Sequence, residues 1–297
     1  MIDVCLLGCG GVMPLPGRFL TSFYVRHDGS AALIDCGEGT QIALRQAAMK
    51  YSRIDTILFT HLHADHISGI VGFLLTLGLE GRTEPLTIYG PMGVTRAVNA
   101  MLIIGPALPF ELIFREFTED TVEFSEIGMK ITAFKAKHSV ECYGYHFQLD
   151  RAPKFDVEKA KALGVPVKYW SILQKGESVE GYAPADVLGE PRKGLSLLYA
   201  TDTRPVEAIS NFGKDADLLV LEGMYGDQEN LEKAEIAGHM TMQEAANIAV
   251  GCNAKKLWLT HYSPAVEDPM VYESDIMLIF PETTMGHDGL AETLKFE

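Results

Sequence analysis

Short apolar runs alternate with segments of helical periodicity along most of the chain. Val4–Leu7 and Ala31–Ile34 are short and almost wholly apolar, as buried strands are, whereas Thr40–Met49 repeats its apolar residues at helical spacing. The other predicted strands are Phe19–Val25, Ile54–Phe59, Leu86–Tyr89, Lys130–Lys137, Cys142–Leu149, Ser196–Ala200, Asp217–Leu221 and Lys256–Leu259. The other predicted helices are His66–Leu79, Gly93–Ile104, Val157–Leu163, Glu229–Ile236 and Met242–Val250. This mixture is typical of an α/β protein.

One region departs from this alternation. Between Asp150 and Lys193 the sequence is rich in Pro, Gly, Lys and Glu, and it has little regular pattern beyond the short helix. We interpret residues 150–194 as an arm inserted into a single domain that spans residues 1–297. An inert surface loop is the alternative, but a segment of this length inside a compact domain is more often functional or mobile.

Composition limits the class of protein. With 297 residues and 47% hydrophobic content, the chain can fill a large core, and no apolar run approaches the roughly 18 residues that span a bilayer. The segment Met1–Gly8 lacks the basic start of a signal peptide, and the five cysteines are scattered and odd in number. We therefore expect a soluble cytoplasmic protein with reduced thiols and no membrane partner.

The net charge of the chain limits the classes of molecule that it can bind. The net charge of −15 argues against broad attraction to nucleic acid, and we expect no DNA partner. The charge is uneven, however, because Arg151–Lys193 carries a small net positive charge. A polyanion would therefore be bound locally by the arm.

The strongest chemical signal is the segment Thr60–His66, Thr-His-Leu-His-Ala-Asp-His, between an apolar strand and a helix. In a turn at the end of a strand, His61 and His63 can point the same way, while Asp65 and His66 can face a second ion. A polar turn is the alternative, but several imidazoles and a carboxylate are costly to bury without a cation. This spacing favours two metal ions over one.

This segment resembles the H-x-H-x-D-H signature of the metallo-β-lactamase superfamily, which implies a four-layer αβ/βα sandwich with metals at strand ends. The further ligands that the resemblance implies are His138, Asp202 and His261, each after a predicted strand. One ion would be held by His61, His63, His138 and Asp202, and the other by Asp65, His66, Asp202 and His261. Asp202 would bridge the two ions, and a set of nitrogen and oxygen ligands suits Zn²⁺, with Mn²⁺ as an alternative.

A wider set of motifs resembles the ribonuclease Z family, endonucleases that trim the 3′ end of precursor tRNA. The matching segments are Leu7–Gly11, Leu33–Gln41, Thr60–Gly69, Phe155–Ala160, Gln174–Glu177, Pro191–Gly194 and Asp202–Pro205. Within them, Asp35–Gln41 is similar to that family's D-C-G-E-G-T-Q. The resemblance implies a metal-dependent phosphodiesterase that acts on precursor tRNA through a hydroxide activated by two metal ions.

The resemblance also implies catalytic roles outside the ligand set. His239, in Gly-His-Met-Thr before the capping box Thr241–Glu244, would contact the scissile phosphate and the leaving oxygen, and Glu222 would orient it. Asp65 would also take or orient the proton of the attacking water. The alternatives are a helix-cap neighbour for His239 and a surface carboxylate for Glu222, since both lie at ordinary ends of elements.

The arm supplies the candidate substrate contacts. Lys168, Tyr169, Trp170 and Lys175 offer charge and a stacking surface, although Trp170 can instead pack the arm internally. The stretch after Pro166 lacks the glycine-proline turn usual in the family's arm. The resemblance further implies a homodimer in which the arm of one subunit presents tRNA to the metal site of the other.

Two other functions remain open from the sequence. A hydrolase of a small phosphodiester, sulfate ester or lactone would use the same metals and would explain the acidic composition. A non-catalytic RNA-binding scaffold would be expected to lack ligands, and none of the seven is missing.

Overall fold

The computed structural model describes residues 1–226 and 228–297. The chain divides into two compact units. The first, called the body, comprises residues 1–148 and 196–295, and the second, called the arm, comprises residues 149–195 with 296–297. No helix among the described residues has the length and the apolar content needed to cross a bilayer.

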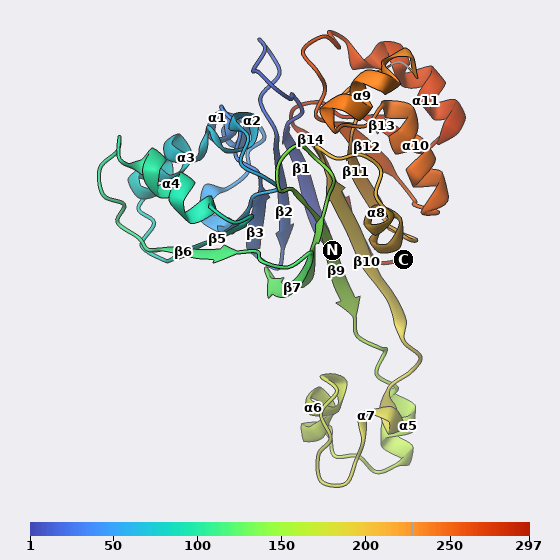
Figure 1. The fold of residues 1–297 in the computed structure, drawn as a ribbon. Coiled ribbons are helices and arrows are strands. Elements are labelled where there is room, and N and C mark those ends of the chain that lie inside the picture. Colours follow the sequence, from blue (N-terminus) through green and yellow to red (C-terminus); the bar gives the residue numbers. More distant parts are fainter. Residues whose placement is uncertain (227) are drawn as a thin grey trace. The chain divides into compact units, whose positions relative to one another are not determined.

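The body is built on two sheets, each with seven strands among the described residues (Figure 1). The first has the order β14 (Leu290–Leu294), β1 (Ile2–Gly8), β2 (Ser22–His27), β3 (Ser30–Ile34), β4 (Ile54–Leu58), β5 (Leu86–Gly90) and β6 (Leu112–Glu116). Its first four strands are antiparallel, whereas β3 to β6 run parallel. The turn after β4 therefore lies at the edge of the sheet where the parallel strands end.

The second sheet has the order β13 (Thr283–Met285), β12 (Leu257–Thr260), β11 (Leu218–Glu222), β10 (Arg192–Ala200), β9 (Tyr143–Arg151), β8 (Met129–Lys135) and β7 (Thr121–Glu126). Strands β10 to β13 are parallel, so their carboxyl ends lie at a common edge. Strands β7 to β9 are antiparallel.

Helices cover the outer faces of both sheets (Figure 1). Helices α1 (Thr40–Gln46), α2 (Ala64–Ile67), α3 (Ile70–Leu79) and α4 (Val94–Leu102) lie beside the first sheet. Helices α8 (Glu207–Phe212), α9 (Leu231–Ala237), α10 (Met242–Gly251) and α11 (Glu273–Ile279) lie beside the second. Single turns of 3₁₀ helix occur at Tyr51–Arg53, Gln228–Asn230 and Pro269–Tyr272. The body is thus the expected four-layer αβ/βα sandwich.

The arm is more regular than its sequence indicates. It contains α5 (Val157–Ala162), a 3₁₀ turn at Val167–Tyr169, α6 (Trp170–Gln174) and α7 (Pro184–Val187). Only the first of these was expected. The arm has a small core of its own, made of Ala160, Val165, Leu173 and Val187.

Two predicted elements need correction. The strand expected over Lys130–Lys137 ends at Lys135, so His138 lies in the following loop and does not close a strand. The helix expected over His66–Leu79 is divided between α2 and α3, because the Gly69 N–H donates to the carbonyl of Cys36 instead of to its own helix. The backbone of Gly69 packs directly against the backbone of Gly37, because a Cβ on Gly69 would lie 2.1 Å from the Gly37 oxygen.

Several short elements were not delimited from the sequence. They are β6, β7, β13, β14, α8 and α11. Strands β6 and β7 are partly exposed and carry charged residues, so their apolar pattern is weak.

Candidate metal centre

The seven candidate ligands come from four separate segments of the body. His61 and His63 lie in the turn after β4, and Asp65 and His66 lie in α2. His138 lies in the loop after β8, Asp202 follows β10, and His261 follows β12 directly. The fold brings these segments together at the ends of the strands of both sheets.

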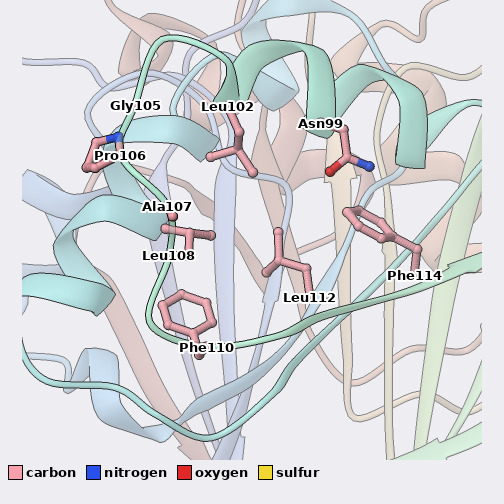
Figure 2. A pocket seen from close by; sticks show the side chains of 9 residues that line it. All are labelled: Asn99, Leu102, Gly105, Pro106, Ala107, Leu108, Phe110, Leu112 and Phe114. Atoms are coloured by element: carbon pink, nitrogen blue, oxygen red, sulfur yellow. The ribbon is translucent and has the colours of Figure 1, made fainter.

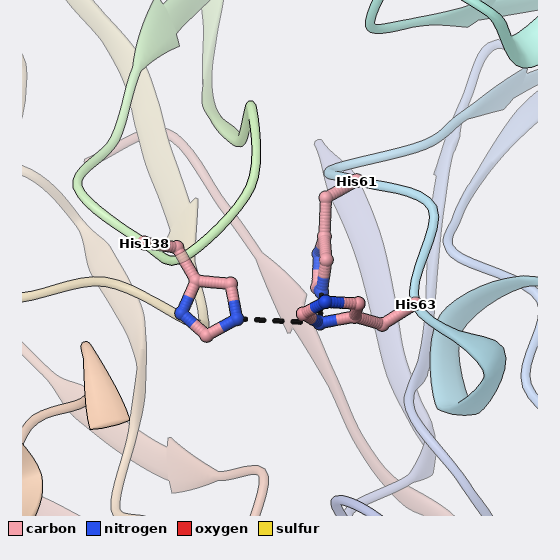
Figure 3. Close-up of side chains that lie close together, drawn as sticks. All are labelled: His61, His63 and His138. Carbon is pink, nitrogen blue, oxygen red and sulfur yellow. Dashed lines mark hydrogen bonds between the residues drawn. The ribbon is translucent and has the colours of Figure 1, made fainter. Parts of the chain in front are cut away.

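Three histidines form one group, shown in Figure 3. His63 Nδ1 lies 2.9 Å from His61 Nε2 and 3.3 Å from His138 Nε2. Asp202 Oδ1 lies 3.9 Å from His61 Nε2 and 3.8 Å from His138 Nε2. These four side chains are the set expected for one ion.

Asp65, His66 and His261 form a second group. The Nε2 atoms of His66 and His261 are 3.1 Å apart, and Asp65 Oδ2 lies 3.7 and 3.5 Å from them. Asp202 Oδ2 lies 3.0 and 3.1 Å from the same two nitrogens. The two oxygens of Asp202 therefore face different groups, as a bridging ligand requires.

The donor set fits divalent cations. Ring nitrogens face one another at hydrogen-bond distance, although a neutral imidazole has only one N–H to donate. Asp202 Oδ2 is buried and makes no well-angled hydrogen bond within the described part of the chain. Burying so many converging lone pairs and an unsatisfied carboxylate oxygen is costly unless a cation binds them. Nitrogen and oxygen donors of this kind suit zinc or manganese.

Three residues of the centre have left-handed backbone conformations. The φ angles are 55° at Asp202, 55° at His261 and 58° at Asp35. Each follows the end of a strand, and the side chains of Asp202 and His261 face His66, which follows a strand of the other sheet. Such conformations cost about 1–3 kcal/mol each and persist where the surrounding structure enforces them.

Asp35 orients His66 from outside the ligand set. Its buried carboxylate lies 2.8 Å from His66 Nδ1 and accepts a hydrogen bond from the Thr60 backbone N–H at 2.8 Å. His66 is thereby held with Nε2 toward the centre, as in many metal sites. Asp35 was not predicted as a site residue, although it begins the Asp35–Gln41 motif.

Neighbouring charges separate the pKa values of the histidines. Burial disfavours the imidazolium of His66, but the carboxylates of Asp202 and Asp35 outweigh this and raise its pKa. Burial lowers the pKa of His61, which His66 lowers further. Burial also lowers the pKa of His138. Two of the three are thus poised as neutral ligands even before a cation binds.

The glycine-rich turn after β1 packs against the centre. A Cβ on Gly11 would lie 2.6 Å from the His261 ring, so only glycine fits there. The next N–H, of Val12, donates to Asp65 Oδ2 at 2.7 Å. The turn therefore fixes one ligand by packing and another by a hydrogen bond.

His239 and Glu222 form a buried pair beside the ligands. His239 Nδ1 lies 2.9 Å from Glu222 Oε2 and 3.7 Å from Asp202 Oδ1. The other oxygen of Glu222 accepts the Thr203 N–H at 2.6 Å. Burial disfavours the charged ring, but the Glu222 carboxylate outweighs it and raises the pKa of His239 to about 9. Glu222 therefore favours the protonated form of His239, the form that can donate a proton.

The predicted capping box after His239 is confirmed. Thr241 Oγ1 accepts the Glu244 N–H, and Glu244 Oε2 accepts the Thr241 N–H at 3.0 Å. The cap fixes the start of α10 two residues after His239.

The four candidate substrate contacts all lie in the arm. Lys168 and Lys175 are exposed, and the Lys168 ammonium lies 4.7 Å from the centre of the Tyr169 ring. Trp170 is half-buried, donates its indole N–H to the Val165 carbonyl at 3.0 Å and contacts Phe155. Trp170 therefore packs within the arm, and its contact with substrate stays a prediction.

Comparison with known proteins gives a consistent result. Residues 31–262 match the family model of the beta-lactamase superfamily domain. Ribonuclease Z from Lachnospira eligens is 48% identical over 100% of this chain and 99% of that protein. Ribonuclease Z from Clostridium acetobutylicum is 43% identical, with coverage of 100% and 99%.

A solved structure agrees with these relatives. The crystal structure of human tRNase Z, short form, has a TM-score of 0.73 and 25% sequence identity. The match covers 99% of this chain and 100% of that chain. The similarity thus includes the arm as well as the body.

Proposed function

This chain belongs to the ribonuclease Z family of the β-lactamase superfamily, and from this premise we propose how it cuts precursor tRNA. It is a metal-dependent endoribonuclease that processes the 3′ end of precursor tRNA. The observation that supports the proposal most directly is the Asp202 carboxylate, whose two oxygens face two separate ligand groups beside the His239–Glu222 pair. The relatives do not favour the small-substrate alternative.

Two divalent ions would occupy the centre, with Zn²⁺ the proposed metal and Mn²⁺ the alternative. The first would be held by His61, His63, His138 and Asp202, and the second by Asp65, His66, Asp202 and His261. Bound divalent ions lower the pKa of a water molecule toward neutrality and stabilise the charge that develops on a phosphodiester.

The side chains move the protons. Asp65, which the Val12 N–H holds in place, accepts or orients the proton of the attacking water. His239 donates a proton to the 3′ oxygen that departs when the bond between phosphorus and that oxygen breaks. Glu222 favours the protonated form of His239 and fixes the orientation of its ring. The products are a tRNA with a 3′-hydroxyl and a trailer with a 5′-phosphate.

The arm is the proposed RNA-binding exosite. Lys168, Tyr169, Trp170 and Lys175 are its candidate contacts, and the two lysines are exposed. The net charge of −15 makes a local contact of this kind more favourable than binding over the whole surface. That DNA is not a partner stays a prediction.

The proposed homodimer uses an apolar face on α3 and α4. Leu79, Ile103 and Ile104 are 89%, 82% and 85% exposed. A groove of about 540 Å³, lined by residues that include Leu102, Pro106 and Leu108, lies at the end of α4 (Figure 2). No charged residue occurs between Ala97 and Phe110. An uncharged face offers no positive charge to RNA phosphates, whereas two copies of this chain can meet there without bringing like charges into contact.

The proposed compartment is the cytoplasm. All five cysteines are buried and free, which fits an environment where thiols stay reduced.

Cleavage mapping on a precursor tRNA tests the catalytic proposal. The enzyme should make a single cut after the base that precedes the trailer, and a chelator should abolish the cut until Zn²⁺ or Mn²⁺ is restored. Metal analysis should give about two ions per chain. Hydrolysis of small diesters by an enzyme that leaves precursor tRNA intact would contradict the proposal, and an Asp65→Ala variant should be inactive on both.

A further inference from the structure

Arg204 lies two residues after Asp202, and the proposed mechanism gives it no role. One of its guanidinium nitrogens, Nη1, donates to the main-chain carbonyl of His239 at 2.6 Å. The same nitrogen donates to Glu244 Oε2 at 2.9 Å, and Nη2 donates to Glu244 Oε1. The side chain is only 13% exposed, so this two-point ion pair is largely shielded from water.

Arg204 joins three segments that carry functional residues. Its own segment contains Asp202, and its backbone N–H donates to the carbonyl of Lys137, beside His138, at 2.9 Å. Its guanidinium reaches the carbonyl of His239. The candidate acid is therefore tied to the segments of two candidate ligands through one residue.

Two other contacts hold His239. Its backbone N–H donates to the Ala234 carbonyl at 2.9 Å, and its ring is held by Glu222. Neither contact fixes the carbonyl side of the residue. That side is the one that the Arg204 guanidinium reaches.

Glu244 gives the arginine a fixed partner. The same carboxylate oxygen that pairs with Arg204 accepts the Thr241 N–H in the capping box. The pair therefore rests on the first turn of α10 and not on a mobile surface side chain. A lysine would supply the charge but not the two parallel donors.

We propose that Arg204, paired with Glu244, is a positioning residue that holds His239 where it can protonate the departing 3′ oxygen. This inference rests on the proposed role of His239 as the acid. Arg204 itself does not touch the substrate, so its loss impairs the step that needs a proton on the leaving group.

The test compares two precursor tRNAs that differ at one atom. In one the scissile linkage is natural, and in the other sulfur replaces the bridging 3′ oxygen, so that the leaving thiolate needs no proton. Arg204→Met should lower kcat on the natural substrate by roughly 10–100-fold, as loss of an outer positioning contact does, with KM nearly unchanged. Cleavage of the sulfur substrate should fall by less than about 3-fold.

Matched variants separate positioning from general damage. Arg82→Met removes a similarly buried arginine that donates to the carbonyls of Ile54 and Pro85, so it controls for lost stability. It should lower both rates equally or not at all. Arg204→Lys should recover part of the activity on the natural substrate only.

A double variant completes the test. His239→Ala should show the same preference for the sulfur substrate, and adding Arg204→Met to it should cost nothing further. If Arg204→Met does not fold, Glu244→Gln weakens the same pair and should give the same pattern. Equal losses on both substrates, or additive losses in the double variant, would overturn the proposal. A wild-type enzyme inactive on precursor tRNA would instead refute the proposed function.

Discussion

The metal centre and the arm differ in how their side chains are held. In the body, five of the seven ligands are buried, and several are fixed by a second contact, as Asp35 fixes His66 and Val12 fixes Asp65. In the arm, the exposed lysines project from short helices around a core of four buried residues. We therefore expect the chemistry to depend on the large core of the body, and the proposed RNA recognition to depend on the arm, which has its own small core. Changes to the metal ligands should therefore alter kcat on every substrate, and changes to the exposed arm lysines should alter only the binding of long RNA.

The largest effect is expected from Asp202→Ala. This change removes both oxygens that face the two ligand groups, and losing several kcal/mol of transition-state stabilisation corresponds to a fall in kcat of roughly 10³-fold or more. The fall should appear on precursor tRNA and on a small diester alike. Single-turnover kinetics and metal analysis measure it.

Asp217→Ala is the control for Asp202. Asp217 is also a body carboxylate with little exposure, but it accepts the Ser196 N–H and pairs with Lys255. Its loss should lower stability and leave the metal content unchanged. If Asp202→Ala retained two ions per chain, the bridging role would be wrong.

A smaller effect in the body is expected from Asp35→Asn. The amide keeps the shape of the carboxylate but loses the charge that orients His66, so metal affinity should fall by about 10–100-fold. Titration of the apoenzyme with Zn²⁺ against a competing chelator measures it, and saturating metal should restore most of the activity. Unchanged affinity would show that Thr60 and the chain around it suffice to orient the ring.

The sequence predicts the centre better than the elements that carry it. Four of the seven ligand candidates are adjacent in Thr60–His66, and Asp202 and His261 follow strands whose apolar runs are clear. These positions are local properties of the chain. The left-handed turns that aim Asp202 and His261 at the other sheet are set by tertiary contacts, which no apolar pattern encodes.

The residues that sequence reasoning missed act through distant partners. Asp35 and His66 are 31 positions apart, and Arg204 and Glu244 are 40 apart. Only the folded chain shows that these pairs meet. The arm was under-predicted for a related reason, because its short helices form around four buried residues and lack a long periodic pattern.

In the arm, the double variant Lys168→Ala, Lys175→Ala should weaken tRNA binding without changing kcat. If both ammonium groups contact phosphates, the slope of log affinity against log salt should fall by about 0.7–0.9 for each. Binding measured at several salt concentrations tests this. The exposed body lysines Lys50 and Lys214 give a matched double variant, and an equal effect there would remove the distinction between the arm and the body.

The smallest effect, confined to the arm, is expected from Trp170→Phe. The ring is kept, but the hydrogen bond from the indole N–H to the buried carbonyl of Val165 is lost, which should cost about 1 kcal/mol. Because the arm has its own small core, this loss should speed hydrogen exchange of arm amides such as that of Ala160 by roughly 5-fold. Amides of β11 and β12 in the body should be unaffected, and tRNA affinity should change less than in the double lysine variant. Faster exchange in both units would mean that the arm and the body unfold together, whereas a large loss of affinity with unchanged exchange would make Trp170 a substrate contact and not a packing residue.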